Sequence, residues 1–154
     1  MRSSTHIPRD ASDDQIVAII QSWVDILAAG EYEIAATELG YALAFDDPKS
    51  ACILRAIEGY RSAKFYPGVE QFSVTDWRAA AGGNPTPRKS ITRYTPNSSG
   101  LAGAAEFDLP LNGRWSDLTA DFVWFVSDDP EGHRLGLEEI SSLRQVQQAA
   151  DGFE

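Results

Sequence analysis

Three aspartates in segments with a strand-like pattern are the residues whose chemistry could be catalytic: Asp76, Asp108 and Asp121. A carboxyl group buried in an apolar pocket has its pKa moved towards neutrality, so that it can act as a general acid or base. Asp108 and Asp121 are out of phase with the apolar positions of their segments, which predicts that they point to solvent or bond to neighbouring strands. Asp76 is in phase with its apolar neighbours, and His133 falls in a predicted turn. The sequence therefore favours a protein without a catalytic residue.

No residue spacing points to nucleophilic catalysis, to a metal or to a cofactor. The single cysteine, Cys52, stands beside Ile53 in a helical pattern, where a packed thiol is the simpler interpretation. His6 and His133 are far apart in the sequence, and the glycines within residues 79–88 lack both the lysine and the spacing of a phosphate-binding loop. We therefore expect neither a metal nor a cofactor, and a lone cysteine excludes an internal disulfide.

Acidic residues gather towards the end of the chain, near a tryptophan in a predicted loop. An exposed tryptophan ringed by carboxylates has the chemistry of an anchor for a basic protein. The alternative is that the tryptophan folds back over the edge of the sheet. The residues expected to contact a partner are Trp115, Asp128, Asp129, Glu131, Glu138 and Glu139, and those expected to line a pocket are Tyr60, Trp77, Tyr94 and Trp124.

Charge divides unevenly along the chain, whose 154 residues carry a formal net charge of −10. Such a chain repels phosphate backbones, which argues against nucleic-acid binding, and attracts a cationic partner. The alternative interpretation is that the charge only maintains solubility. Residues 78–105 differ from the rest, because they hold no acid and four bases, Arg78, Arg88, Lys89 and Arg93.

Length and hydropathy predict one domain over residues 12–145, with a flexible arm at residues 1–11 and a flexible tail at residues 146–154. No run approaches the roughly 18 apolar residues of a membrane span. The first ten residues carry arginines but no apolar run after them, so they do not read as a signal peptide. We therefore expect a cytoplasmic protein without membrane contact.

Three helices are predicted in the first half of the chain. The first begins with a capping-box spacing at Ser12 and ends at Gly30, with a wide apolar face between them. The second covers residues 31–39. The third starts at the pair Asp47-Pro48, and its apolar stripe consists of Ile53, Leu54, Ile57 and Tyr60.

Five strands are predicted after the helices, at residues 72–77, 89–95, 101–111, 118–127 and 134–142. Asn112-Gly113 is a strong hairpin signal, and the fourth strand is apolar on both faces at its centre, as expected of a central strand. Helices followed by strands predict an α+β domain in which N-terminal helices pack on a curved antiparallel sheet of about five strands.

Two stretches carry a resemblance to known domains. The capped first helix and its continuation "DILAAGEYEIAATEL", followed by a meander of long strands, resemble the nuclear transport factor 2-like superfamily. The stretch "FDLPLNGRWSDLTADFVWFV…RLGLEEISSL" is similar to an uncharacterised bacterial domain family with a "GRSDLT" strand entry, in which Trp115 is here an insertion. The resemblance covers residues 13–143 in layout and implies a cone-like sheet around a cavity. The superfamily includes isomerases, dehydratases and polyketide cyclases, but also transport factors, oligomerisation modules and toxin-neutralising immunity proteins.

Acidity, the lack of a catalytic set and the resemblance together favour a non-enzymatic protein-binding domain. In its most concrete form it is an immunity-like protein that neutralises a basic bacterial toxin through an acidic surface. Two alternatives stay open. One is a small-molecule enzyme with a cavity, which requires a buried carboxylate beside a tyrosine or histidine. The other is an accessory module that forms a homodimer through its sheet face.

Overall fold

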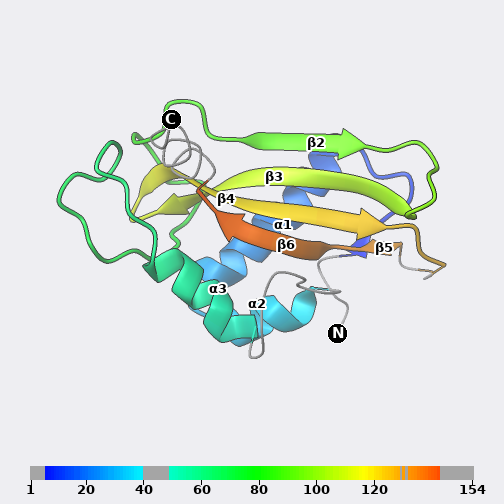
Figure 1. The fold of residues 1–154 in the computed structure, drawn as a ribbon, viewed down its shortest axis with the longest axis horizontal. Coiled ribbons are helices and arrows are strands. Elements are labelled where there is room, and N and C mark those ends of the chain that lie inside the picture. The colour runs from blue at the N-terminus through cyan, green and yellow to red at the C-terminus, as the bar shows by residue number, and fades with distance from the viewer. Residues whose placement is uncertain (1–5, 40–48, 129, 131, 143–154) are drawn as a thin grey trace, which may run out of the picture.

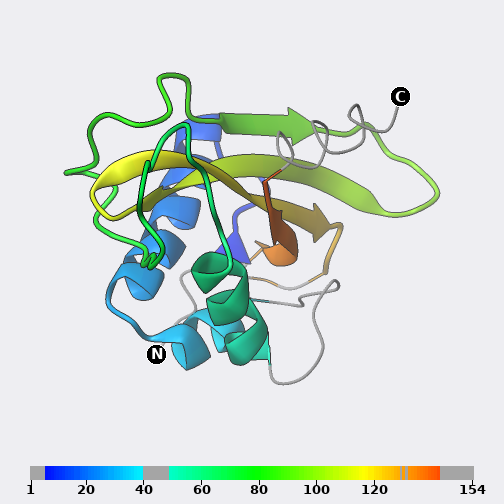
Figure 2. The ribbon, with the colours of Figure 1, turned by 60° about the vertical axis from the view of Figure 1, so that its left-hand side comes forward.

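The computed structural model describes residues 6–39, 49–128, 130 and 132–142 of the chain (Figure 1). Within these residues the fold is α+β, with three helices and two antiparallel sheets of two and four strands. Helix α1 crosses behind the larger sheet in Figure 1, and α2 and α3 lie together below it. Figure 2 shows the same arrangement after a turn of the molecule, with the long strands above α2 and α3 and with α1 rising to the level of β2.

Helix α1, Asp13–Ala28, confirms the predicted first helix. The side chain of Ser12 accepts from the backbone N–H of Gln15, whose side chain accepts in return from the N–H of Ser12. Asp13 and Asp14 lie in the first turn, where the positive end of the helix dipole favours them. The face turned to the sheet is buried and consists of Ile16, Ile20, Trp23, Val24 and Leu27.

Helices α2, Tyr32–Glu38, and α3, Lys49–Glu58, are also where the sequence predicts them. The indole of Trp23 in α1 donates to the carbonyl oxygen of Ala35 at 2.8 Å, which ties α2 to the first helix. Ile53 and Ile57 are the fully buried positions of the α3 stripe. The predicted Asp47-Pro48 start of α3 lies outside the described residues.

The larger sheet has the strand order β2-β3-β4-β6 and is antiparallel throughout. Its strands are β2 (Lys89–Arg93), β3 (Leu101–Leu111), β4 (Arg114–Phe125) and β6 (Gly136–Ser141). β4 is central, as predicted, and it starts at Arg114 instead of residue 118. The reason is the two-residue turn Asn112-Gly113, in which both residues have positive φ values of 51° and 80°, so that Leu111 pairs directly with Arg114.

Residues 72–77, predicted as the first strand, are not a strand. Only Val74 forms a bridge, to Leu111 at the end of β3. The N–H of Thr75 donates to the carbonyl oxygen of Pro110, but a proline has no N–H with which to continue a ladder. The alternation in this segment instead buries Phe72 and Val74 beneath the sheet.

The smaller sheet joins β1 (His6–Ile7) to β5 (His133–Arg134). Residues 6–11, which the sequence assigns to an arm, therefore include a paired segment, and Ile7 and Ala11 belong to the hydrophobic core. The predicted strand at residues 134–142 is divided between β5 and β6, with the buried Leu135 between them.

The core lies between α1 and the inner face of β3 and β4, which we define as the face turned to α1. Ala105 and Phe107 of β3 alternate with outward residues, and Phe122 of β4 meets the ring of Trp23 edge-on at 5.3 Å between centroids. Gly103 is required beneath Trp124, because a Cβ atom there would lie 2.3 Å from the indole. The opposite, outer face of the same strands carries a different set of side chains.

Candidate functional site

Four carboxylates gather on the outer face of the sheet around a hollow of about 410 Å³. The strand register places Glu106 of β3 opposite Asp121 of β4, and Asp121 opposite Glu139 of β6. Like charges directly across strands repel one another, so this row is unfavourable for the isolated domain. We call this group, Glu106, Asp121, Glu138 and Glu139, the acidic basin.

A bulge in the pairing of β4 with β6 brings two consecutive glutamates to the same side. Asp121 pairs with Glu139 while the next residue, Phe122, pairs with Leu137, so Glu138 is the extra residue. Glu138 and Glu139 consequently both line the hollow, although neighbours in a regular strand point to opposite faces. The bulge therefore increases the negative charge of the basin.

Asp121 is the most perturbed group of the basin. Its Oδ1 atom is buried without a hydrogen-bond partner among the described residues. Burial first, and then the neighbouring charges of Glu106 and Glu139, raise the pKa of its carboxyl from 3.8 to about 6. Arg88 acts in the opposite direction, but its guanidinium lies 3.7 Å from Glu106, a long ion pair. The basin can therefore accept a further cation or hydrogen-bond donor.

The basin continues into uncharged and aromatic surface. Ser90 and Thr92 of the edge strand β2, and Tyr94 directly after it, line its other side. Tyr94 and Phe125 are exposed for 43% and 38% of their surface, which is high for such large side chains. An acidic hollow beside exposed aromatic rings combines the two features that protein-binding surfaces share, an apolar anchor and a polar surround.

The structure brings together only some of the residues expected to contact a partner. Glu138 and Glu139 lie in the basin, and Asp128 is exposed beyond the end of β4. Trp115 pairs with Pro110 at the opposite end of β4 and is half-buried against Phe107, so it is not ringed by these acids. Asp129 and Glu131 lie outside the described residues.

The four residues expected to line a pocket are likewise distributed over different parts of the fold. Tyr94 lines the hollow of the acidic basin, and Trp77 lines a separate cleft beside α1. Tyr60 and Trp124 are buried, with 3% of their surface exposed each. Trp124 packs over Gly103, so its side chain fills the core.

Asp108 is fully supplied with hydrogen bonds. It is 1% exposed and accepts from Thr119 Oγ1 at 2.6 Å, from the N–H of Arg88 at 2.7 Å and from Asn84 Nδ2 at 3.1 Å. Burial raises the pKa of its carboxyl, while these donors favour the charged form. Its partners join the 82–88 loop to the β3–β4 hairpin, as expected of a carboxylate that bonds to neighbouring strands. Asp76 is exposed, accepts from Arg78 and does not line a cavity that we describe.

A second buried carboxylate, Asp117, accepts from the phenol of Tyr60 at 2.6 Å. Burial and this hydrogen bond raise the pKa of Tyr60 well above its usual range, so the phenol keeps its proton and acts as a donor. The pair joins the segment after α3 to β4 in the interior. It is a buried carboxylate beside a tyrosine, as the enzyme alternative requires, but neither residue lines the acidic basin or the cleft beside α1, so we interpret it as a structural contact between a helix end and the sheet.

The sequence pattern did not identify Glu106 as a candidate site residue, and it predicted that the side chain of Asp121 points to solvent or bonds to neighbouring strands. Both were recognisable as polar residues out of phase with an apolar strand face. Their meeting with Glu139 depends on the register of three strands, for which the sequence carries no local signal.

Among the described residues, no group of three or more histidine, cysteine or acidic side chains has a geometry that could hold a metal ion. In the same part of the chain, no helix combines the length and apolar character needed to cross a membrane. Comparison with protein-family models, with curated proteins and with solved structures gives no match for this chain.

Proposed function

We propose that this protein is a non-enzymatic binding domain that holds a basic protein partner against the acidic basin. The observation that carries the proposal is the row Glu106–Asp121–Glu139, three carboxylates directly across three strands with one distant guanidinium. Such a row is costly in the free domain, and a cation placed over it relieves the repulsion. Relief of this repulsion therefore contributes favourably to the free energy of binding.

The exposed aromatic residues extend this surface. Tyr94, directly after β2, and Phe125, at the end of β4, are exposed and can contact apolar atoms of the same partner. Lysine and arginine side chains present both a charge and an apolar stem, and so match an acidic hollow beside aromatic rings. The partner is expected to present such cations from one rigid face.

In its most concrete form the proposed partner is a bacterial toxin, and this chain is its immunity-like inhibitor. The net charge of −10 supports fast association with a basic protein. The proposal includes the nuclear transport factor 2-like architecture with a cone-like curved sheet and a cytoplasmic location. A homodimer through the same outer face is disfavoured, because two acidic basins repel each other.

The test is co-expression with the open reading frame adjacent to the gene. Growth inhibition by that reading frame and rescue by this protein are expected. The triple variant Glu106→Gln, Asp121→Asn, Glu139→Gln should lose rescue, and calorimetry with the purified partner should show weaker binding by more than about tenfold. Rescue that persists in this variant would remove the acidic basin from the proposal.

A matched control changes the same number of charges elsewhere. Glu31, Glu33 and Glu70 are exposed, and their triple replacement by glutamine raises the net charge by the same amount. This control should retain rescue and most of the affinity. Equal loss in both triple variants would show that only overall charge matters, and a wild-type protein that gives no rescue would contradict the immunity-like role.

A small-molecule enzyme is the second candidate, and one observation favours it. The carboxyl of Asp121 has a pKa of about 6, within the range of a general base near neutral pH. Its hollow, however, is mostly polar and open, whereas acid–base enzymes of this type exclude water from the reacting carboxyl. We therefore place the enzyme behind the binding domain.

A further inference from the structure

A second hollow, of about 380 Å³, opens beside α1 on the side of the sheet away from the acidic basin. Its walls come from four parts of the chain: helix α1, the segment around Trp77, the residues leading into β2, and the β3–β4 hairpin. We call it the aromatic cleft. Its principal side chains are Gln21, Trp77, Lys89, Phe107 and Trp115.

Three aromatic side chains line the cleft together with the cationic residues Arg78, Arg88 and Lys89. Trp115 meets Phe107 edge-on, with 6.3 Å between ring centroids and 72° between planes. Trp77 is half-buried opposite them, and the guanidinium of Arg78 covers its ring at 4.3 Å. Flat walls of this kind favour a flat ligand, which can stack or meet the rings edge-on. The volume fits a molecule of two fused rings.

Trp77, which lines the cleft, has a buried hydrogen-bond donor without an acceptor in the part of the chain that the structure describes. The Nε1 atom of Trp77 is buried and has no acceptor among the described residues. An indole N–H in the interior normally finds a partner, because leaving it unpaired costs free energy. By contrast, the indole of Trp23 donates to a carbonyl oxygen. A ligand with an acceptor atom would satisfy Trp77.

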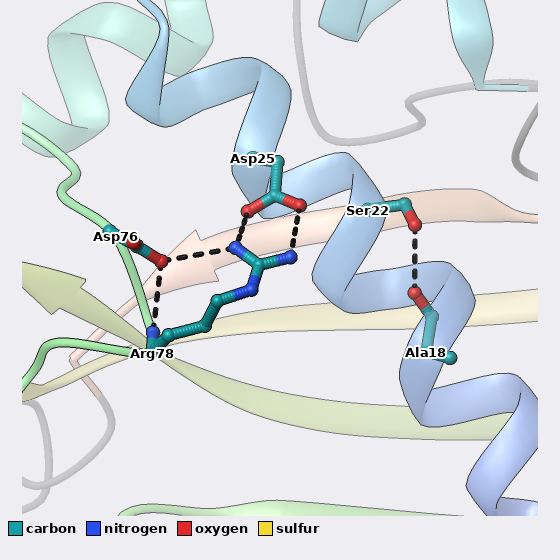
Figure 3. Close-up of polar contacts among 5 residues, drawn as sticks. All are labelled: Ala18, Ser22, Asp25, Asp76 and Arg78. Atoms are coloured by element: carbon teal, nitrogen blue, oxygen red, sulfur yellow. Dashed lines mark hydrogen bonds and ion pairs between the residues drawn. The ribbon is translucent and has the colours of Figure 1, made fainter.

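One lysine that lines the cleft has no ion-pair partner among the described residues. Arg78 makes a two-point ion pair with Asp25 at 2.9 and 3.0 Å and a further bond to Asp76 at 3.1 Å, so both carboxylates are paired with this one guanidinium (Figure 3). Lys89 has no carboxylate within ion-pair distance among the described residues. It pairs across the strands with Phe107 and lines the cleft. This lysine belongs to residues 78–105, which carry no acid.

We infer that the aromatic cleft binds a small planar ligand that carries a carboxylate. The ring system contacts Trp77, Phe107 and Trp115, and the carboxylate binds the Lys89 ammonium. An acceptor atom of the ligand takes the indole N–H of Trp77. This inference does not depend on the proposed partner, because the cleft and the acidic basin lie on opposite sides of the strands.

The probe for the test is 2-naphthoate, and its neutral isostere 2-naphthamide is the comparison. The four tryptophans give four indole N–H signals in a ¹H–¹⁵N spectrum. Titration with 2-naphthoate should shift the signals of Trp77 and Trp115 and leave those of Trp23 and Trp124 in place. The Kd is expected below about 1 mM, as is usual for a ligand of this size. Absence of any shift at 5 mM probe, about five times that limit, would overturn the inference.

Variants separate the charge from the rings. Lys89→Met keeps the apolar stem and should weaken 2-naphthoate about tenfold while leaving 2-naphthamide unchanged. The control Lys64→Met removes an exposed lysine that lies over Phe65, away from the cleft, and should leave both affinities unchanged. Equal affinity of the two probes for the wild-type protein would overturn the carboxylate assignment.

Trp77→Phe provides a third, independent measurement. It keeps an aromatic wall but removes the N–H, and it should weaken both probes, because both carry a carbonyl-type acceptor. If this variant does not fold, Lys89→Met still decides the inference by itself. Unchanged affinity in both variants would contradict it.

Discussion

The two faces of β3 and β4 differ strongly in their side chains, although alternate residues of the same two strands form them. On the inner face, Phe107 and Phe122 are buried against α1, and on the outer face their sequence neighbours Glu106 and Asp121 form part of the acidic basin. One face gains free energy by removing apolar surface from water. The other holds like charges together at a cost.

This difference separates stability from recognition. The inner face contains well-packed rings, such as Trp23 against Phe122, and defines the fold. The outer face contains a carboxylate, Asp121, with a buried oxygen that has no hydrogen-bond partner among the described residues. A surface that is unfavourable in the free domain and exposed is a surface on which a partner can gain free energy. The comparison can be tested one residue at a time.

The largest effect is expected on the inner face. Phe122→Ala should lower the free energy of unfolding by about 3–5 kcal/mol, because it leaves a cavity beneath Trp23. The control is Phe125→Ala in the same strand, which removes a ring exposed for 38% of its surface and should cost about 1 kcal/mol or less. Denaturant melts of both variants give the two numbers. Similar costs would show that the faces are not distinct.

A second prediction concerns the close approach of backbone and ring on the inner face. Gly103→Ala should destabilise the protein by about 1–3 kcal/mol, because the new Cβ would lie 2.3 Å from the Trp124 indole. The double variant Gly103→Ala, Trp124→Leu makes room for the methyl group and should cost less than the sum of the two single changes. Strict additivity of the two costs would contradict the proposed collision.

A third prediction compares a buried tyrosine hydroxyl that donates to a carboxylate with an exposed tyrosine hydroxyl. Tyr60→Phe removes the donor of the buried Asp117 and should cost about 1–3 kcal/mol. The control Tyr94→Phe removes an exposed hydroxyl at the basin and should be close to neutral. Thermal melts decide between them, and a neutral Tyr60→Phe would show that water replaces the phenol at Asp117.

The smallest effect, about 1 kcal/mol, is expected at Asp121, and its sign is opposite. The folded-state pKa of Asp121, about 6, lies above the ordinary value of 3.8, so the folded protein binds more protons than the unfolded chain between these pH values. The contribution of this group to the free energy of unfolding therefore falls as the pH rises from about 4 to 6. Asp121→Asn removes a penalty that is complete above about pH 6, and should stabilise the protein at pH 7 by about 1 kcal/mol after allowance for solvent screening.

The pH dependence provides the control for that variant. The advantage of Asp121→Asn over the wild-type protein should shrink as the pH is lowered from 7 to 4, since the carboxyl of the folded wild-type protein is then protonated and no longer repels its neighbours. Asp128→Asn, an exposed acid beyond β4, should show no comparable pH-dependent difference. A destabilised Asp121→Asn at pH 7 would mean that the carboxylate has a donor in the folded protein.

Much of the fold was predictable because its signals are local. The capping box at Ser12, the Asn112-Gly113 turn and the alternation of residues 101–111 each depend on a few neighbouring residues, and each is found in the structure. The strand predicted at residues 72–77 failed because pairing is not local. Its pattern is that of a strand, but Pro110 cannot donate to it, and only the Val74–Leu111 bridge forms.

The candidate sites were less predictable than the fold. Glu138 and Glu139 were expected at a binding surface and do line the basin, but Trp115 was expected beside them and lies at the other end of β4. The sequence places residues along a strand and cannot say which strand end meets which loop. The aromatic cleft shows the same limit. Trp77 and Trp115 line one cleft only because the β3–β4 hairpin folds against the segment after residue 76.

By itself, the sequence determined which side chains share a strand face and where α1 begins and ends, because a side-chain period of two or 3.6 residues and a capping box are properties of the local chain. Only the tertiary structure decided that Glu106, Asp121 and Glu139 stand in one row, and that a bulge adds Glu138 to them. The physical reason is that register is set by pairing between distant segments, and a shift of one residue would turn every side chain to the opposite face.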